Sequence, residues 1–69
     1  MVATLLTPGR LYATESMAGP TILRFVKENK ATDTIYFEPV NDKKTGYLVD
    51  STGYIPFGGS LAQFFTPVN

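Results

Sequence analysis

Glycine and proline residues divide this 69-residue chain into short segments. Six glycines and five prolines recur along its length, and four of them form the pairs Gly19-Pro20 and Gly58-Gly59. Proline has no backbone N–H and glycine favours turns, so such residues end helices and strands after a few residues. Short extended segments at intervals of roughly ten residues, separated by such breakers, are typical of small β-barrels and sandwiches.

The segments between the breakers predict five short extended stretches. Apolar and polar side chains alternate over residues 10–14 and 34–38, as expected for strands. Residues 21–28 also fit the period of a helix, but their β-branched and aromatic side chains and their short length favour a strand. Two further extended stretches are expected at 47–50 and 54–57.

Polar segments between these stretches are typical of turns. Residues 15–20 predict a loop, residues 29–33 predict a hairpin loop, and residues 41–46 and 50–53 predict turns that end in glycine.

A helical turn is expected near the C-terminus. Residues 60–63 have the Ser-x-x-Gln form of a capping box, in which Ser60 caps the turn and Gln63 reaches back to it. Pro67 would end the turn and Val68 would begin a last strand pairing.

The sequence therefore predicts one mostly β domain over residues 1–69, a small five-stranded antiparallel barrel with one short helical turn. Closure of the sheet would remove exposed strand edges.

The apolar side chains that share one face of these stretches form the predicted core. They are Leu11, Leu23, Phe25, Ile35, Phe37, Leu48 and Ile55, together with Leu61 and Phe64 of the helical turn.

The composition argues against an enzyme or a metal site. The chain has neither cysteine nor histidine, so it lacks the thiolate ligands and the commonest general base of active sites. Its acidic residues fall in predicted loops or at strand ends, and no spacing pairs two of them. Gly58-Gly59-Ser60 offers backbone donors to an anion, but a simple turn is the favoured interpretation because no lysine follows. We therefore predict no catalytic residue, no cofactor and no metal.

The charge balance narrows the class of partner. Six basic and six acidic side chains give a net charge of zero, which argues against a generic phosphate binder. The absence of cysteine fits a cytoplasmic location, and neither a membrane-spanning apolar run nor a secretory signal is expected.

Two motifs resemble the Src-homology-3 family. Leu11-Tyr12 occurs near the start of the first stretch, where the family has its Ala-Leu-Tyr-Asp-Tyr motif. Residues 52–56, Thr-Gly-Tyr-Ile-Pro, are similar to the family's Gly-hydrophobic-Pro stretch, which precedes a helical turn and the last strand. The resemblance implies a Src-homology-3-like barrel topology, with residues 60–65 as the helical turn. It concerns topology alone, because the chain has no tryptophan and the family's proline-binding groove uses one.

Aromatic side chains are abundant for so short a chain. Four tyrosines and five phenylalanines are hard to bury completely, and such rings are enriched at protein interfaces. We therefore predict a non-enzymatic protein-interaction module, a class that includes small phage-type or regulatory inhibitors that bind a host or partner protein. The predicted partner-binding residues are Tyr12, Tyr36, Tyr54, Pro56 and Phe57.

A second interpretation is a small barrel that binds single-stranded nucleic acid, with bases stacked on tyrosines beside basic side chains. The side chains available for it are Tyr12, Tyr36, Tyr47 and Tyr54, with Arg24, Lys27, Lys30, Lys43 and Lys44. The neutral overall charge favours the protein partner. Self-association into a homo-oligomer is also expected, because a core this small has no disulfide to supplement it.

Overall fold

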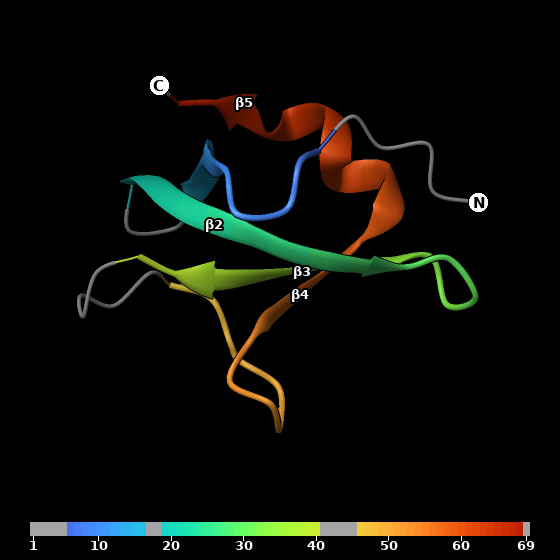
Figure 1. Ribbon diagram of the computed structural model, residues 1–69. Coiled ribbons are helices and arrows are strands. Elements are labelled where there is room, and N and C mark those ends of the chain that lie inside the picture. Colours follow the sequence, from blue (N-terminus) through green and yellow to red (C-terminus); the bar gives the residue numbers. More distant parts are fainter. Residues whose placement is uncertain (1–5, 17–18, 41–45, 69) are drawn as a thin grey trace.

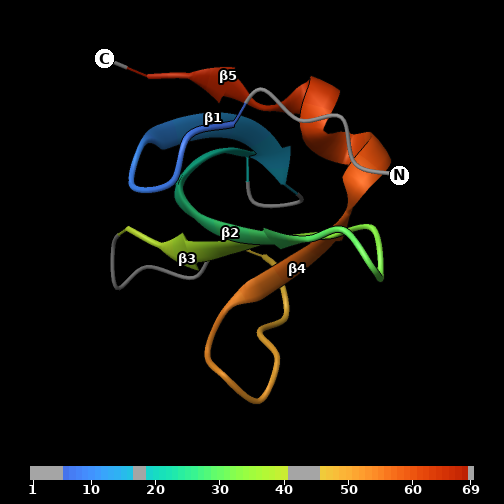
Figure 2. The ribbon, with the colours of Figure 1, turned by 45° about the vertical axis from the view of Figure 1, so that its right-hand side comes forward.

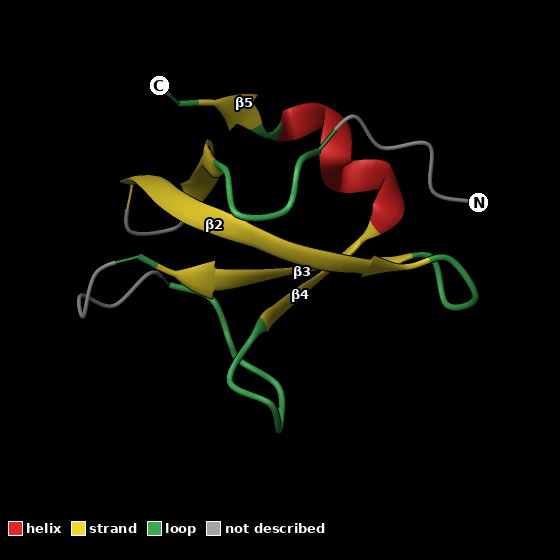
Figure 3. Cartoon of the chain, in the orientation of Figure 1, coloured by secondary structure: helices red, strands yellow, loops and turns green. Residues whose placement is uncertain are grey.

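A computed structural model describes residues 6–16, 19–40 and 46–68 of the chain (Figure 1). Its strands are β1 (Leu11–Ser16), β2 (Gly19–Asn29), β3 (Thr34–Pro39), β4 (Ile55–Gly58) and β5 (Thr66–Pro67). They form one antiparallel sheet in the order β4-β3-β2-β1-β5. A 3-10 helix, η1 (Gly59–Phe64), joins β4 to β5 (Figure 3). The predicted mostly β fold with a helical turn near its C-terminus is confirmed, whereas the sheet is open within the described residues.

The long strand β2 joins the two halves of the sheet. Its first part pairs with β1, from Ser16 opposite Gly19 to Leu11 opposite Arg24, and its second part pairs with β3. The strand curves strongly, so β1 and β5 lie over one side of it and β3 and β4 over the other (Figure 2). Leu23 and Arg24 have strand partners on both sides, and Phe25, opposite Phe37, also exchanges backbone hydrogen bonds with Gly9 and Arg10. The bend encloses a core between the two halves.

A β-bulge in β2 changes which face its side chains occupy. Phe25 lies opposite Phe37, but Lys27 lies opposite Tyr36, so Val26 is an extra residue in the ladder. Side chains alternate along a strand, and an uninterrupted β2 would put Lys27 on the inner face with Phe25. The bulge moves Lys27 to the outer face, beside Tyr36.

An aromatic cluster fills the core. The buried side chains are Tyr12, Leu23, Phe25, Ile35, Phe37, Ile55 and Phe65. Phe37 is at the centre: its ring stacks on Phe65 with centroids 4.2 Å apart and meets Phe25 edge-on at 5.4 Å. Five residues of the predicted core are thus confirmed, and Tyr12 and Phe65 complete it.

Four residues of the predicted core lie elsewhere. Leu11 is half-buried, because it is opposite Arg24 on the outer face while its neighbour Tyr12 points inward. Leu48 is 89% exposed. Leu61 and Phe64 are 38% and 61% exposed, since three residues make one turn of a 3-10 helix and both lie on its solvent side.

Two local predictions are wrong. Residues 47–50 form no strand but belong to the segment that projects from the sheet before β4 (Figure 1). The capping box is also absent, because Gly58 is the N-cap of η1 and no side chain caps it. The strands β1 and β2 extend into the predicted loop at 15–20 as far as Ser16 and Gly19, respectively. The predicted turn at 41–46 lies almost entirely outside the described residues, as do Lys43 and Lys44.

Each edge strand carries a proline. Pro56 in β4 lies opposite Tyr36, and Pro67 in β5 lies opposite Tyr12. A proline cannot donate to the ladder, so it fits an edge strand with its nitrogen turned away from the neighbour. Consistent with this, the next backbone N–H after Pro67, that of Val68, donates to the carbonyl of Leu11 at 2.9 Å.

Candidate functional site

The structure separates the predicted partner-binding residues onto two faces. Tyr12 is 3% exposed and belongs to the core, where its hydroxyl accepts a hydrogen bond from the backbone N–H of Thr7 at 2.7 Å. Phe57 is half-buried on the inner face, with its ring centroid 5.5 Å from that of Phe37. Tyr36 and Pro56 lie opposite each other on the outer face of β3 and β4, and Tyr54, just before β4, shares the Lys27 ammonium group with Tyr36. The predicted set is therefore not one continuous surface.

An apolar pocket of about 400 Å³ opens on the inner-face side, between η1 and the segment that follows Gly46. Its lining residues are Thr14, Glu15, Tyr47, Phe57, Leu61, Phe64 and Phe65. Phe57 forms the floor, with its ring edge-on to Tyr47 at 4.9 Å and to Phe65 at 5.1 Å. The pocket is thus continuous with the aromatic core. Of the predicted site residues, Phe57 contributes to it.

A hydrogen bond to β1 positions Tyr47, which forms one wall of the pocket. Its hydroxyl donates to the backbone carbonyl of Glu15 at the end of the strand. Burial raises the pKa of Tyr47, and the negative charge of Glu15 raises it further, while a hydrogen bond with Thr14 acts in the opposite direction. The phenol therefore stays protonated and keeps donating at neutral pH. The segment after Gly46 is held against β1 although it forms no strand.

The opposite wall exposes apolar side chains to solvent. Phe64 is 61% exposed and Leu61 is 38% exposed, on the same side of η1. Exposed large apolar groups beside a concave apolar surface mark interaction sites in soluble proteins. Both residues belong to the predicted core, so their exposure corrects that prediction. The adjacent pair Phe64-Phe65 could have indicated this exposure, because two neighbouring rings rarely point into the same core.

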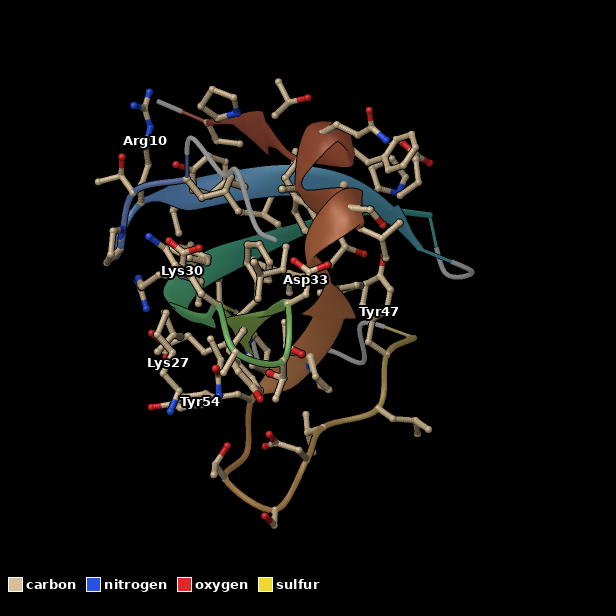
Figure 4. All side chains as sticks on the ribbon, turned by 90° about the vertical axis from the view of Figure 1, so that its right-hand side faces the viewer. Arg10, Lys27, Lys30, Asp33, Tyr47 and Tyr54 are labelled. Carbon is tan, nitrogen blue, oxygen red and sulfur yellow. The ribbon has the colours of Figure 1, made fainter. Side chains whose placement is uncertain are left out.

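The outer face carries a second cluster, made by Lys27, Tyr36 and Tyr54. The Nζ of Lys27 lies 5.3 Å from the ring centroid of Tyr36 and 5.9 Å from that of Tyr54. These distances are within the range of cation–π attraction. Figure 4 shows Lys27 and Tyr54 side by side, with Tyr47 on the opposite side of the molecule.

A turn before β4 holds Tyr54 in this cluster. The Oδ1 of Asp50 accepts hydrogen bonds from the backbone N–H groups of Thr52 at 2.9 Å and Tyr54 at 3.2 Å, and also from the Thr52 hydroxyl. The Thr52 hydroxyl lowers the pKa of Asp50 most; desolvation opposes it, and the two backbone N–H groups and the positive charge of Lys27 lower the pKa further. Gly53 completes the predicted tight turn at φ +89°, and its N–H donates to the Asp50 carbonyl at 3.0 Å.

No group of three or more metal-ligating side chains occurs within residues 6–16, 19–40 and 46–68. In the same part of the chain no helix has the length and apolar character needed to cross a membrane. Comparison of the chain with protein-family models, with curated proteins and with solved structures gives no match.

Proposed function

We propose that this chain is a non-enzymatic protein-interaction module that binds a partner through the apolar pocket. The observation that carries the proposal is the exposure of Phe64 and Leu61 at the mouth of a pocket of about 400 Å³. A fully apolar wall facing water costs free energy, roughly 25 cal/mol for each Å² that remains exposed. A partner that covers these two side chains recovers that free energy.

The proposed occupant is one or two apolar side chains presented by a segment of another protein. The volume of the pocket is near the lower end of the range for ligand sites, so a whole protein surface cannot enter it. The hydrogen bond from Tyr47 to β1 fixes one wall before binding, and the core rings Phe57 and Phe65 fix the floor. A preformed pocket of this kind loses little entropy when a side chain fills it.

The arrangement of the strands supports a Src-homology-3-like small barrel as part of this proposal. A helical turn, η1, precedes the last strand, and that strand returns beside β1. The resemblance implies a helical turn in this position. A cytoplasmic location, expected from the cysteine-free composition, also belongs to the proposal.

The test uses peptides, because the partner is not identified. A random peptide library is selected on the immobilised protein, and the affinities of the selected peptides are measured by fluorescence polarisation. Phe64→Ser is expected to weaken binding about tenfold or more, the effect of losing a central aromatic contact. Leu48→Ser is the matched control: it also removes an exposed apolar side chain, one that is 89% exposed outside the pocket lining.

Both substitutions replace solvent-exposed side chains, so neither is expected to change the melting temperature greatly. The proposal is wrong if the library yields no binding peptide, or if the selected peptides bind the Phe64→Ser variant as tightly as the parent.

A further inference from the structure

The outer-face cluster of Lys27, Tyr36 and Tyr54 is built by the fold rather than by flexible surface side chains. The bulge at Val26 turns Lys27 outward, opposite Tyr36 in the register of β2 and β3. Bulges commonly occur where a strand must re-aim one side chain. Pro56 is opposite Tyr36 on the neighbouring strand, which adds a rigid apolar element beside the rings.

The position of Tyr54 is fixed independently of the sheet. Its N–H donates to the Asp50 carboxylate, and its carbonyl accepts from the backbone N–H of Asp50 at 2.7 Å. The backbone that carries Tyr54 is therefore held in place before any ligand binds, which lowers the entropy lost in ordering this part of the cluster.

The positive charges near the cluster lie along one side of the molecule. Figure 4 shows Arg10, Lys30 and Lys27 on the same side as Tyr54. Arg24 belongs to an ion pair, with its Nη1 3.1 Å from Glu38 Oε2. Within the described residues, by contrast, neither Lys27 nor Lys30 lies within ion-pair distance of a carboxylate.

We propose that this outer face binds single-stranded nucleic acid, with bases stacked on Tyr36 and Tyr54 and phosphates held by Lys27 and Lys30. Stacking platforms beside cations are the common design of single-strand binders, because every base has a flat face. Lysine is depleted at the centre of protein interfaces, so a cluster centred on Lys27 favours an anionic partner over a second protein. Paired bases in a duplex cannot reach the rings.

This second function is additional to protein binding, and it involves other residues than those of the apolar pocket. The apolar pocket is on the side of Tyr47, opposite Tyr54 in Figure 4, so both sites can be occupied together. Because the net charge of the chain is zero, binding is expected to be weak, and the phosphate contacts of Lys27 and Lys30 make its affinity fall as the salt concentration rises.

The experiment measures fluorescence anisotropy of labelled oligo-dT and oligo-U of about a dozen nucleotides, a length that spans one small barrel. A duplex of the same length is the comparison, and the salt concentration starts at about 50 mM because salt weakens phosphate contacts. The chain has no tryptophan, so quenching of its tyrosine fluorescence reports stacking directly. We expect binding of the single strands with quenching, and much weaker binding of the duplex.

Substitutions of the two tyrosines and of Lys27 test the assigned roles. Tyr36→Leu and Tyr54→Leu are each expected to weaken binding about tenfold, whereas Phe64→Ser, which removes a ring at the apolar pocket, is the control. Lys27→Gln changes an exposed side chain that no core contact requires, and it is expected to reduce the slope of log affinity against log salt by roughly 0.7. Tyr54→Phe keeps the ring and is expected to bind like the parent.

Several results would overturn the inference. They are an absence of single-strand binding at low salt, equal binding of the duplex, and unchanged affinity in the Tyr54→Leu and Lys27→Gln variants. Loss of selected-peptide binding in Tyr54→Leu would instead assign this face to a protein partner. The Phe64→Ser variant separates the two proposals, because it is expected to lose peptides while it retains oligonucleotides.

Discussion

Truncation of Phe37 to alanine is the most direct test of the core. Its side chain is 0% exposed, it stacks on Phe65 at 4.2 Å, and it meets the rings of Phe25 and Phe57 edge-on at 5.4 and 5.5 Å. Replacement of a buried phenylalanine by alanine costs about 3–5 kcal/mol, from the lost transfer free energy and the cavity that remains. Each disrupted ring pair adds to the upper part of that range.

That loss is comparable with the whole stability of the domain. At about 0.05–0.15 kcal/mol per residue, a chain of this length has roughly 3–10 kcal/mol of unfolding free energy. Phe37→Ala is therefore expected to lose from about a third to all of the unfolding free energy, and its unfolding midpoint falls accordingly.

The measurement is urea unfolding followed by far-UV circular dichroism. Phe64→Ala is the control, because it removes the same ring from a position that is 61% exposed, and it is expected to cost less than about 1 kcal/mol. Equal midpoints for the two variants would show that Phe37 is not at the centre of the core and that the register of β3 is different.

Three further predictions concern the bulge, the Asp50 turn and self-association. Deletion of Val26 is expected to leave the chain folded, because Lys27 then follows Phe25 directly and stays on the outer face opposite Tyr36; a variant that does not fold would contradict the bulge. The lowered pKa of Asp50 means that its ionised form stabilises the fold above the ordinary carboxyl range, and that this contribution is lost as the pH falls through the lowered pKa. The melting temperature of the parent should therefore exceed that of Asp50→Asn at about pH 7 and approach it at about pH 2.5, and a gap that does not depend on pH would count against this. Light scattering at high concentration is expected to show a homo-oligomer that Phe64→Ser converts to monomer, and an oligomer that persists in the variant would exclude the pocket as its interface.

The strands that could be predicted are those in which local alternation and tertiary packing agree. Ile35 and Phe37 alternate with polar or amphipathic neighbours, and both are fully buried. Side chains alternate between the two faces of a strand, so the assignment of β3 as a strand puts Ile35 and Phe37 on the same face. The helical turn was predictable in position, because Gly58-Gly59 ends β4 and Pro67 follows soon after.

The wrong predictions concern segments whose structure depends on tertiary contacts rather than on the local sequence pattern. Leu48 and Val49 have the apolar character of a strand, yet the hydrogen bonds of Asp50 and Tyr47 hold this segment in a loop. Nothing in the local pattern shows that Val26 is an extra residue, so the position of Lys27 depends on its pairing with Tyr36. Leu61 and Phe64 of the pocket were assigned to the core for the same reason, whereas Tyr36, Tyr54 and Lys27 of the outer face were among the residues that the sequence offered as candidates.

The prolines at the two ends of the sheet limit how copies of this chain can aggregate. Fibril growth needs an edge strand with a full row of backbone donors, onto which another chain can add. Pro56 removes a donor from the outer edge of β4, and Pro67 removes one from that of β5. Each edge therefore presents an interrupted row of donors, which makes it a poorer template for the addition of another strand.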